Sequence, residues 1–171
     1  IIQSFPQGST AWGSYFSCLI APPKQIKVYF SVFNNGTTSL KRFKNRATQE
    51  AYDFKFQNYE NPVILADGAR WIWDYADIHH PNAIQILDYY HASEYLGNAW
   101  SSLKSPKDIT NKKIKKQLFD WLWNGKIKSI ISFLLDQDST EEVLSCIRYF
   151  KNNQHRMRYK FYRDKGLDIG S

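Results

Sequence analysis

The sequence predicts a protein of the α/β class, and two short apolar runs, each followed by a helical pattern, carry that prediction. The run PVILA (62–66) is continuously apolar, which is typical of a strand buried in a parallel sheet, and AIQIL (83–87), apolar apart from Gln85, is predicted to be another strand. Aromatic segments with a helical pattern follow at 69–80 and 89–103. Strand, helix, strand, helix in this order indicates a βαβ arrangement.

The residues before this unit are less regular. IKVYFSVF (26–33) is rich in β-branched and aromatic residues and predicts a further strand. Apolar residues at helical spacing, with basic residues between them, predict a helix within 40–59. Residues 1–25 carry Gly, Ser and Pro and are interpreted as a loop.

From about residue 110 the pattern is helical throughout. Gly125 is placed to end the first of these helices. Ser139 and Glu142 form an S-x-x-E pattern, which predicts a capping box at the start of a later helix. A basic helix is expected over 155–166. The second half of the chain is therefore predicted to be helical.

Composition bounds the class of protein. The 171 residues are 43% hydrophobic and 16% aromatic, which is enough for a packed core and argues against disorder. The net charge of +7 favours a nucleic-acid or acidic-surface partner, although a basic protein without such a partner is an equal alternative.

The cysteines and the lengths of the apolar runs bear on the cellular compartment and on membrane association. Cys18 and Cys146 form no C-x-x-C pattern, so neither a disulfide framework nor a zinc site is expected, and a reducing cytoplasmic setting is the default. No apolar run reaches the roughly 18 residues that a membrane span needs, so no membrane partner is expected.

Two aspartates follow the two apolar strands. Asp67 directly follows the first and Asp88 the second, at the edge where α/β sheets place their sites. Such a carboxylate suits a hard cation such as Mg²⁺. His91 lies three residues after Asp88, so the two side chains can share a helix face. The alternative for each aspartate is a helix cap, with His91 an ordinary helix-face residue.

Three basic segments contain or adjoin apolar and aromatic residues, at 40–46, 111–117 and 155–163. Basic and aromatic residues in alternation suit a surface that follows a phosphate backbone, whereas a solvated helix face is the alternative. The chain contains no G-x-G-x-x-G, P-loop, G-x-S-x-G or H-E-x-x-H motif, so it gives no support to those chemistries.

Two blocks resemble a known family. The stretch DGARWIWDYADIHHPNAIQILDYYHASEYL (67–96) and the stretch YFKNNQHRMRYKFYRDKGLDIGS (149–171) are similar to the DDE-type transposases of bacterial insertion sequences, in the group related to Mutator-like elements. The resemblance covers 60–171, with a further strand match at 26–33. It implies a partial ribonuclease-H-like core over 26–105 and a helical insertion with C-terminal helices over 106–171, and it leaves 1–25 unassigned.

The resemblance also implies a chemistry. Three carboxylates in this family hold two Mg²⁺ or Mn²⁺ ions, which activate a nucleophile for attack on a DNA phosphodiester. Asp67 matches the second carboxylate and a metal ligand, and Asp88 with His91 matches the D-x-x-H signature near the active site. Nucleic-acid contacts are assigned by the same match to the last basic segment, at Arg156, Arg158, Lys160 and Arg163.

The pattern is incomplete within these residues. No Asp or Glu precedes Glu50, where the first carboxylate is expected, and the third is expected beyond Ser171. The first hypothesis is therefore an internal fragment of a transposase, inactive alone, whose complete form is expected to bind insertion-sequence ends and target DNA as a homo-oligomer. The alternatives are a non-catalytic basic nucleic-acid-binding protein and a relic reading frame without function.

Overall fold

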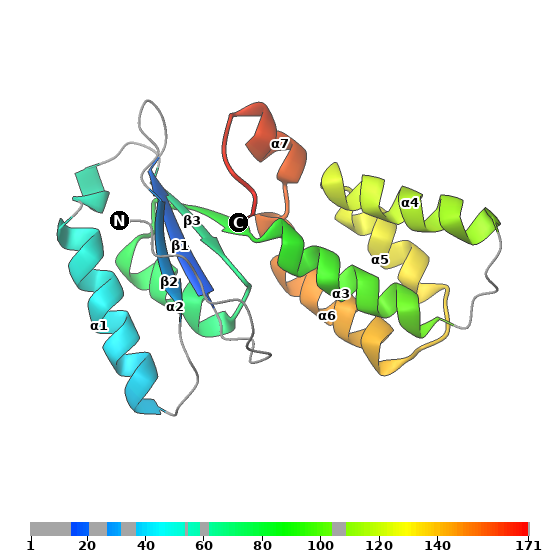
Figure 1. Ribbon diagram of the computed structural model, residues 1–171, viewed down its shortest axis with the longest axis horizontal. Coiled ribbons are helices and arrows are strands. Elements are labelled where there is room, and N and C mark those ends of the chain that lie inside the picture. Colours follow the sequence, from blue (N-terminus) through cyan, green and yellow to red (C-terminus); the bar gives the residue numbers. More distant parts are fainter. Residues whose placement is uncertain are drawn as a thin grey trace, which may run out of the picture.

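The computed structural model describes residues 15–20, 27–31, 37–53, 55–58, 62–103 and 109–170 (Figure 1). The predicted loop at 1–14 and 21–25, and the predicted boundary between 105 and 106, lie outside these ranges.

A four-stranded sheet forms one half of the molecule, in the order β2-β1-β3-β4. β1 (Tyr15–Ile20) pairs antiparallel with both β2 (Lys27–Ser31) and β3 (Pro62–Ala66). β3 pairs parallel with β4 (Ile84–Leu87). The α/β class and the parallel pair predicted from the two apolar runs are confirmed.

β1 corrects the sequence prediction, because residues 15–20 were interpreted as part of a loop. The segment YFSCLI consists mostly of strand-forming residues. The Gly, Ser and Pro residues around it obscured that signal. Pairing on both sides places β1 inside the sheet, between β2 and β3.

β3 lies at the centre of the buried core. All five of its residues are buried, from Pro62 to Ala66. It is hydrogen-bonded on both sides, and its side chains face apolar neighbours above and below the sheet. This explains why its sequence is continuously apolar and does not alternate.

Two helices cover the sheet: α1 (Thr37–Asp53) lies on the side away from the helical half, and α2 (Arg70–His79) lies across the strands (Figure 1). α1 is followed by the short η1 (Phe56–Asn58), and α2 follows β3. Ala47 on α1 and Phe56 on η1 are buried in the core. The predicted helices in these regions are therefore confirmed.

The other half of the molecule is helical. α3 (Tyr89–Ser102) packs along α6 (Glu141–Asn153), while α4 (Ile109–Trp123) and α5 (Ile127–Leu135) pack beside them (Figure 1). No helix in the described ranges is both long and apolar enough to cross a membrane.

The last predicted helix is divided. η2 (Gln154–Arg156) continues α6, and α7 (Tyr159–Asp164) follows after a break at residues 157–158. α7 contacts α4. The periodic basic pattern over 155–166 therefore belongs to two short elements, because tertiary packing places Arg156, Met157 and Tyr159 in the interior.

Two predicted helix ends have different outcomes. Gly125 ends α4 as predicted, at a φ of 68° that favours glycine. The predicted capping box at Ser139 is wrong, because Thr140 is the N-cap of α6 and its hydroxyl accepts a hydrogen bond from the Val143 N–H at 3.2 Å.

Candidate functional site

Asp67 and Asp88 meet at one edge of the sheet, as the sequence predicted. Each directly follows a strand, and β3 and β4 run parallel. The Asp88 N–H donates a hydrogen bond to the Ala66 carbonyl at 2.8 Å, which extends the pairing beyond the last residue of β4. The two aspartates therefore leave neighbouring strands at the same end.

Asp67 is buried, with 6% of its surface exposed, and shapes the turn after β3. Its Oδ1 accepts a hydrogen bond from the Ala69 N–H at 2.9 Å. The N-cap of α2 is Ala69, which makes no side-chain cap bond. The alternative interpretation of Asp67 as the helix cap is therefore wrong, and its carboxylate closes the turn instead.

Asp88 is fully buried and is the N-cap of α3. Its Oδ1 accepts a hydrogen bond from the His91 N–H at 2.9 Å. The cap interpretation of Asp88 is thus confirmed. Its Oδ2 faces Gly170, since a Cβ built on that glycine would lie 3.3 Å from this oxygen.

The His91 ring belongs to a separate set of contacts. Its Nδ1 lies 3.4 Å from Glu94 Oε2, one turn along α3. The ring also lies in T-shaped contact with the rings of Tyr95 and Tyr149, with centroids 5.6 and 6.1 Å away. The hydrogen bond from His91 to Asp88 therefore comes from its backbone, and Glu94 is the carboxylate beside its imidazole.

Tyr149 connects the helical half to this edge, and sequence reasoning did not single it out. Its hydroxyl donates a hydrogen bond to the Asp67 carbonyl at 2.5 Å. Its ring stacks on Tyr95 at 3.9 Å, with an interplanar angle of 3°. Gly68 admits this approach, because its φ is 88° and an added Cβ would lie 2.7 Å from the Tyr149 hydroxyl.

A buried tyrosine lies behind the same edge. Tyr159 is fully buried, and its hydroxyl has no hydrogen-bond partner among the described residues. Burial raises the pKa of Tyr159 well above its ordinary value, and the nearby Tyr149 and Asp88 raise it further. The Tyr159 side chain therefore stays neutral.

The end of the described chain returns to the site. The Tyr89 N–H donates a hydrogen bond to the Ile169 carbonyl at 2.7 Å. Gly170 packs against the Tyr90 ring and faces Asp88. Residues 167–170 therefore lie beside the strand edge that carries the two aspartates.

Arg156 is buried, with only 9% of its surface exposed, and this disagrees with its predicted role in facing DNA. Its Nε donates a hydrogen bond to Gln85 Oε1 at 2.7 Å, and its guanidinium lies 4.4 Å from the centre of the Trp73 ring. Burial lowers the pKa of Arg156, and Asp77 opposes that shift. Arg156 thus holds η2 against β4 and α2.

The other three predicted nucleic-acid contacts lie at α7. Arg158 and Lys160 are exposed; the Arg158 guanidinium covers the Phe161 ring at 4.1 Å, and Lys160 pairs with Asp164 at 2.6 Å. The half-buried Arg163 donates to the Trp123 carbonyl at 3.0 Å. Arg158 is therefore available to a polyanion, Lys160 can bind one by exchanging its exposed partner Asp164, and Arg163 anchors α7 to α4.

The described residues do not fit the two-metal centre that the resemblance implies. No group of three or more His, Cys, Asp or Glu side chains in the described ranges is placed to hold a metal ion. Asp67 and Asp88 each use one oxygen to organise the backbone. The described site therefore consists of two carboxylates at the ends of β3 and β4, beside a basic surface. It lacks a complete set of metal ligands.

Comparison with protein-family models, with curated proteins and with solved structures finds no match to this chain.

Proposed function

We propose that this chain is part of the catalytic domain of a DDE-type transposase, and that these residues bind DNA without cutting it. One observation carries the proposal. Asp67 and Asp88 end adjacent parallel strands, and residues 167–170 return beside them. In the family that the sequence resembles, the catalytic carboxylates gather at such a strand edge, and the third follows the segment that ends here in Gly170 and Ser171.

The architecture supports the same proposal at a coarser level. An antiparallel pair of strands joins a parallel pair in one mixed sheet, and a helical half follows. This is the type of arrangement expected of a ribonuclease-H-like core with a helical insertion. A ribonuclease-H-like fold is therefore part of what we propose for this chain.

We assign DNA binding, and no catalytic step, to these residues. The family resemblance implies two divalent ions, Mg²⁺ or Mn²⁺, whose role is to activate the nucleophile and stabilise the leaving oxygen. Asp67 is the one residue of this chain that matches a metal ligand, so we assign no cleavage step to it. Arg158 and Lys160 supply exposed positive charge for a phosphate backbone.

A fluorescence anisotropy titration with a labelled DNA duplex tests the proposal. Binding should weaken steeply with salt, because phosphate contacts release counterions. Arg158→Ala with Lys160→Ala should weaken it further and reduce the salt dependence. Lys112→Ala with Lys113→Ala removes equal charge at the distant start of α4 and serves as the control. Salt-independent binding would contradict the DNA-binding proposal.

Asp67→Asn separates the transposase proposal from a binding protein without catalytic ancestry. If Asp67 contributes to a metal site, Mn²⁺ should change the DNA affinity of the parent chain and have a smaller effect on the variant. Equal effects of Mn²⁺ on the parent chain and on Asp67→Asn would favour the alternative of a non-catalytic nucleic-acid-binding protein. The observation that supports this alternative is the complete burial of Asp88, which caps α3. Strand cleavage by the parent chain that Asp67→Asn abolishes would contradict the assignment of binding alone.

A further inference from the structure

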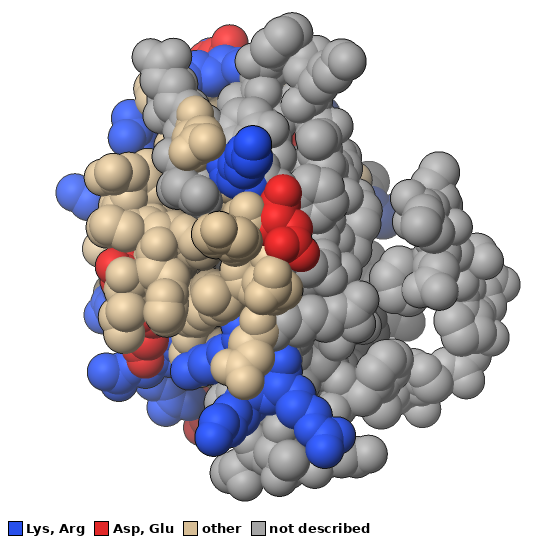
Figure 2. All heavy atoms as spheres, turned by 90° about the vertical axis from the view of Figure 1, so that its left-hand side faces the viewer, with Lys and Arg blue, Asp and Glu red and all other residues tan. Residues whose placement is uncertain are grey.

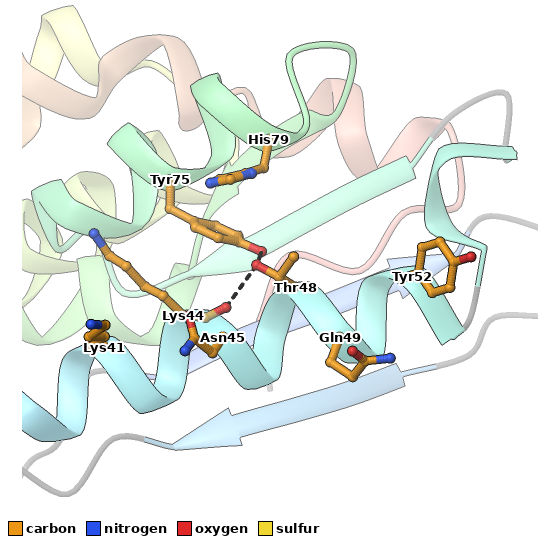
Figure 3. Close-up of a pocket in the computed structure, with 8 residues that line it drawn as sticks. All are labelled: Lys41, Lys44, Asn45, Thr48, Gln49, Tyr52, Tyr75 and His79. Carbon is orange, nitrogen blue, oxygen red and sulfur yellow. Dashed lines mark hydrogen bonds between the residues drawn. The ribbon is translucent and has the colours of Figure 1, made fainter.

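An open groove runs between α1 and α2, on a different part of the molecule from the strand edge. Its volume is about 910 Å³. Figure 2 shows the face of the molecule on which α1 lies, and Figure 3 shows the residues of the groove. The lining residues are Lys41, Lys44, Asn45, Thr48, Gln49 and Tyr52 from α1, with Tyr75 and His79 from α2.

The floor of the groove is fixed by a hydrogen bond between the helices. The Thr48 hydroxyl donates to the Lys44 carbonyl at 2.9 Å, so the Tyr75 hydroxyl donates to Thr48 Oγ1 at 2.8 Å (Figure 3). Tyr75 is 4% exposed, and its ring packs at 4.5 Å from the His79 ring. The wall from α2 is therefore an ordered aromatic surface.

One end of the groove is positively charged. Lys41 is exposed and Lys44 is half-buried, and Lys44 extends toward α2 (Figure 3). Among the described residues, no Asp or Glu lines the groove and neither lysine forms an ion pair. Lys and Arg side chains gather at the lower end of this face in Figure 2, where α1 begins in Figure 1. This end is suited to an anion.

The other end presents Tyr52, which is 70% exposed, whereas the exposed His79 ring lies midway along the groove beside Tyr75 (Figure 3). Between the two ends lie the amides of Asn45 and Gln49, and Gln49 donates to Asp53 Oδ1 at 2.8 Å. Positive charge, amide groups and open ring faces thus follow one another along a single face of α1.

We propose that this groove binds single-stranded nucleic acid. Phosphates lie at Lys41 and Lys44, and unpaired bases stack on Tyr52 and His79. Stacking requires exposed base faces, which a duplex keeps inside, so a single strand fits this surface better than a double helix. The site uses neither Asp67 nor a metal ion, so it does not depend on the catalytic ancestry proposed above.

The experiment titrates a labelled oligothymidylate with the whole chain in EDTA, over a series of salt concentrations. Lys41→Ala with Lys44→Ala should weaken binding and reduce the salt slope by about 1.4, at roughly 0.7 for each single-strand phosphate contact. Tyr52→Ala should weaken binding by about 5- to 150-fold, the equivalent of a lost base stack, and Tyr52→Trp should restore it. Urea unfolding confirms that each variant is folded.

Matched controls make the result decisive. Lys112→Ala with Lys113→Ala removes the same charge away from the groove and should have the smaller effect. An equal loss in this control, or an unchanged affinity in Tyr52→Ala, would overturn the proposal. A loss confined to the variants of Arg158 and Lys160 would contradict the groove while leaving the α7 surface supported.

Discussion

The hydroxyl of Tyr149 donates a hydrogen bond to the backbone carbonyl of Asp67 at 2.5 Å, across 82 positions of sequence. Tyr149→Phe removes this bond and keeps the stacked ring. Since the net contribution of such a bond is modest, we expect a loss of about 1 kcal/mol in the free energy of unfolding. Urea denaturation measures it.

Tyr149→Ala provides the comparison, because it also removes the stack on Tyr95. Truncating a fully buried aromatic costs about 3–5 kcal/mol, so the half-buried Tyr149 should lose less than this in Tyr149→Ala, but clearly more than in Tyr149→Phe. Equal losses in the two variants would mean that the ring contributes nothing. Tyr90→Phe, at an exposed position, should be nearly neutral.

The two aspartates of the strand edge should differ in their effect on stability. Asp88→Ala removes the N-cap of α3 and should cost about 0.5–2 kcal/mol, whereas Asp88→Asn keeps an accepting oxygen and should cost less. Thermal unfolding of the two variants compares them. If Asp88→Asn destabilised the protein as much as Asp88→Ala, the carboxylate charge would matter more than the cap.

Arg156 and Arg158 should separate stability from DNA affinity. Arg156→Ala leaves Gln85 without its buried partner and removes the contact with Trp73, so we expect a loss of at least about 2 kcal/mol in the free energy of unfolding. Arg158→Ala should weaken DNA binding with little effect on unfolding, because Arg158 is exposed. The reverse pattern would restore the DNA-facing role predicted for Arg156.

Stability should fall below neutral pH, in part through His80. Burial lowers the pKa of His80, and the nearby His79 lowers it further, so the folded state favours the neutral ring. Its stabilising contribution is complete above the unfolded pKa of about 6.5 and is lost as the pH falls through the folded pKa.

His80→Phe tests this linkage, because it keeps a ring against Phe56 and removes the titrating group. The free energy of unfolding, measured by urea denaturation from pH 7.5 to pH 5, should depend less on pH in this variant. A residual dependence of the same sign is expected from His155, whose pKa burial also lowers. An unchanged slope would exclude His80 as a contributor.

Two glycines should respond oppositely to alanine. Gly97 lies within α3 with open space around its Cβ position, so Gly97→Ala should stabilise the protein by about 0.5–1 kcal/mol. Gly125 has a φ of 68°, and an added Cβ would lie 2.9 Å from the Met157 carbonyl oxygen. Gly125→Ala should therefore destabilise, by about 1–2 kcal/mol or more. Differential scanning calorimetry distinguishes the two signs.

The sequence was informative wherever local pattern and burial agree. The short, mainly apolar runs of β3 and β4 predicted both strands and placed Asp67 and Asp88 at one edge. Gly125 was recognisable because a left-handed position after a helix strongly favours glycine. These features depend on neighbouring residues alone, so a single sequence was sufficient to predict them.

The remaining features depend on contacts between distant parts of the chain. Nothing near Tyr149 or Arg156 in sequence indicates that one would bind the turn at Asp67 and the other pack on Trp73. β1 needed β2 and β3 as partners before its apolar residues could be distinguished from a loop. The groove between α1 and α2 likewise combines residues from two segments that a reading along the chain treats separately.

The return of residues 167–170 to Asp88 has a consequence for the order of assembly during synthesis. β3, β4 and the start of α3 leave the ribosome before Ile169, whose carbonyl accepts from the Tyr89 N–H and which follows about eighty residues later. Until then the strand edge lacks one of its walls. Asp67 and Asp88 are thus synthesised well before residues 167–170. The surroundings of their carboxylates are completed only when this last described segment has emerged.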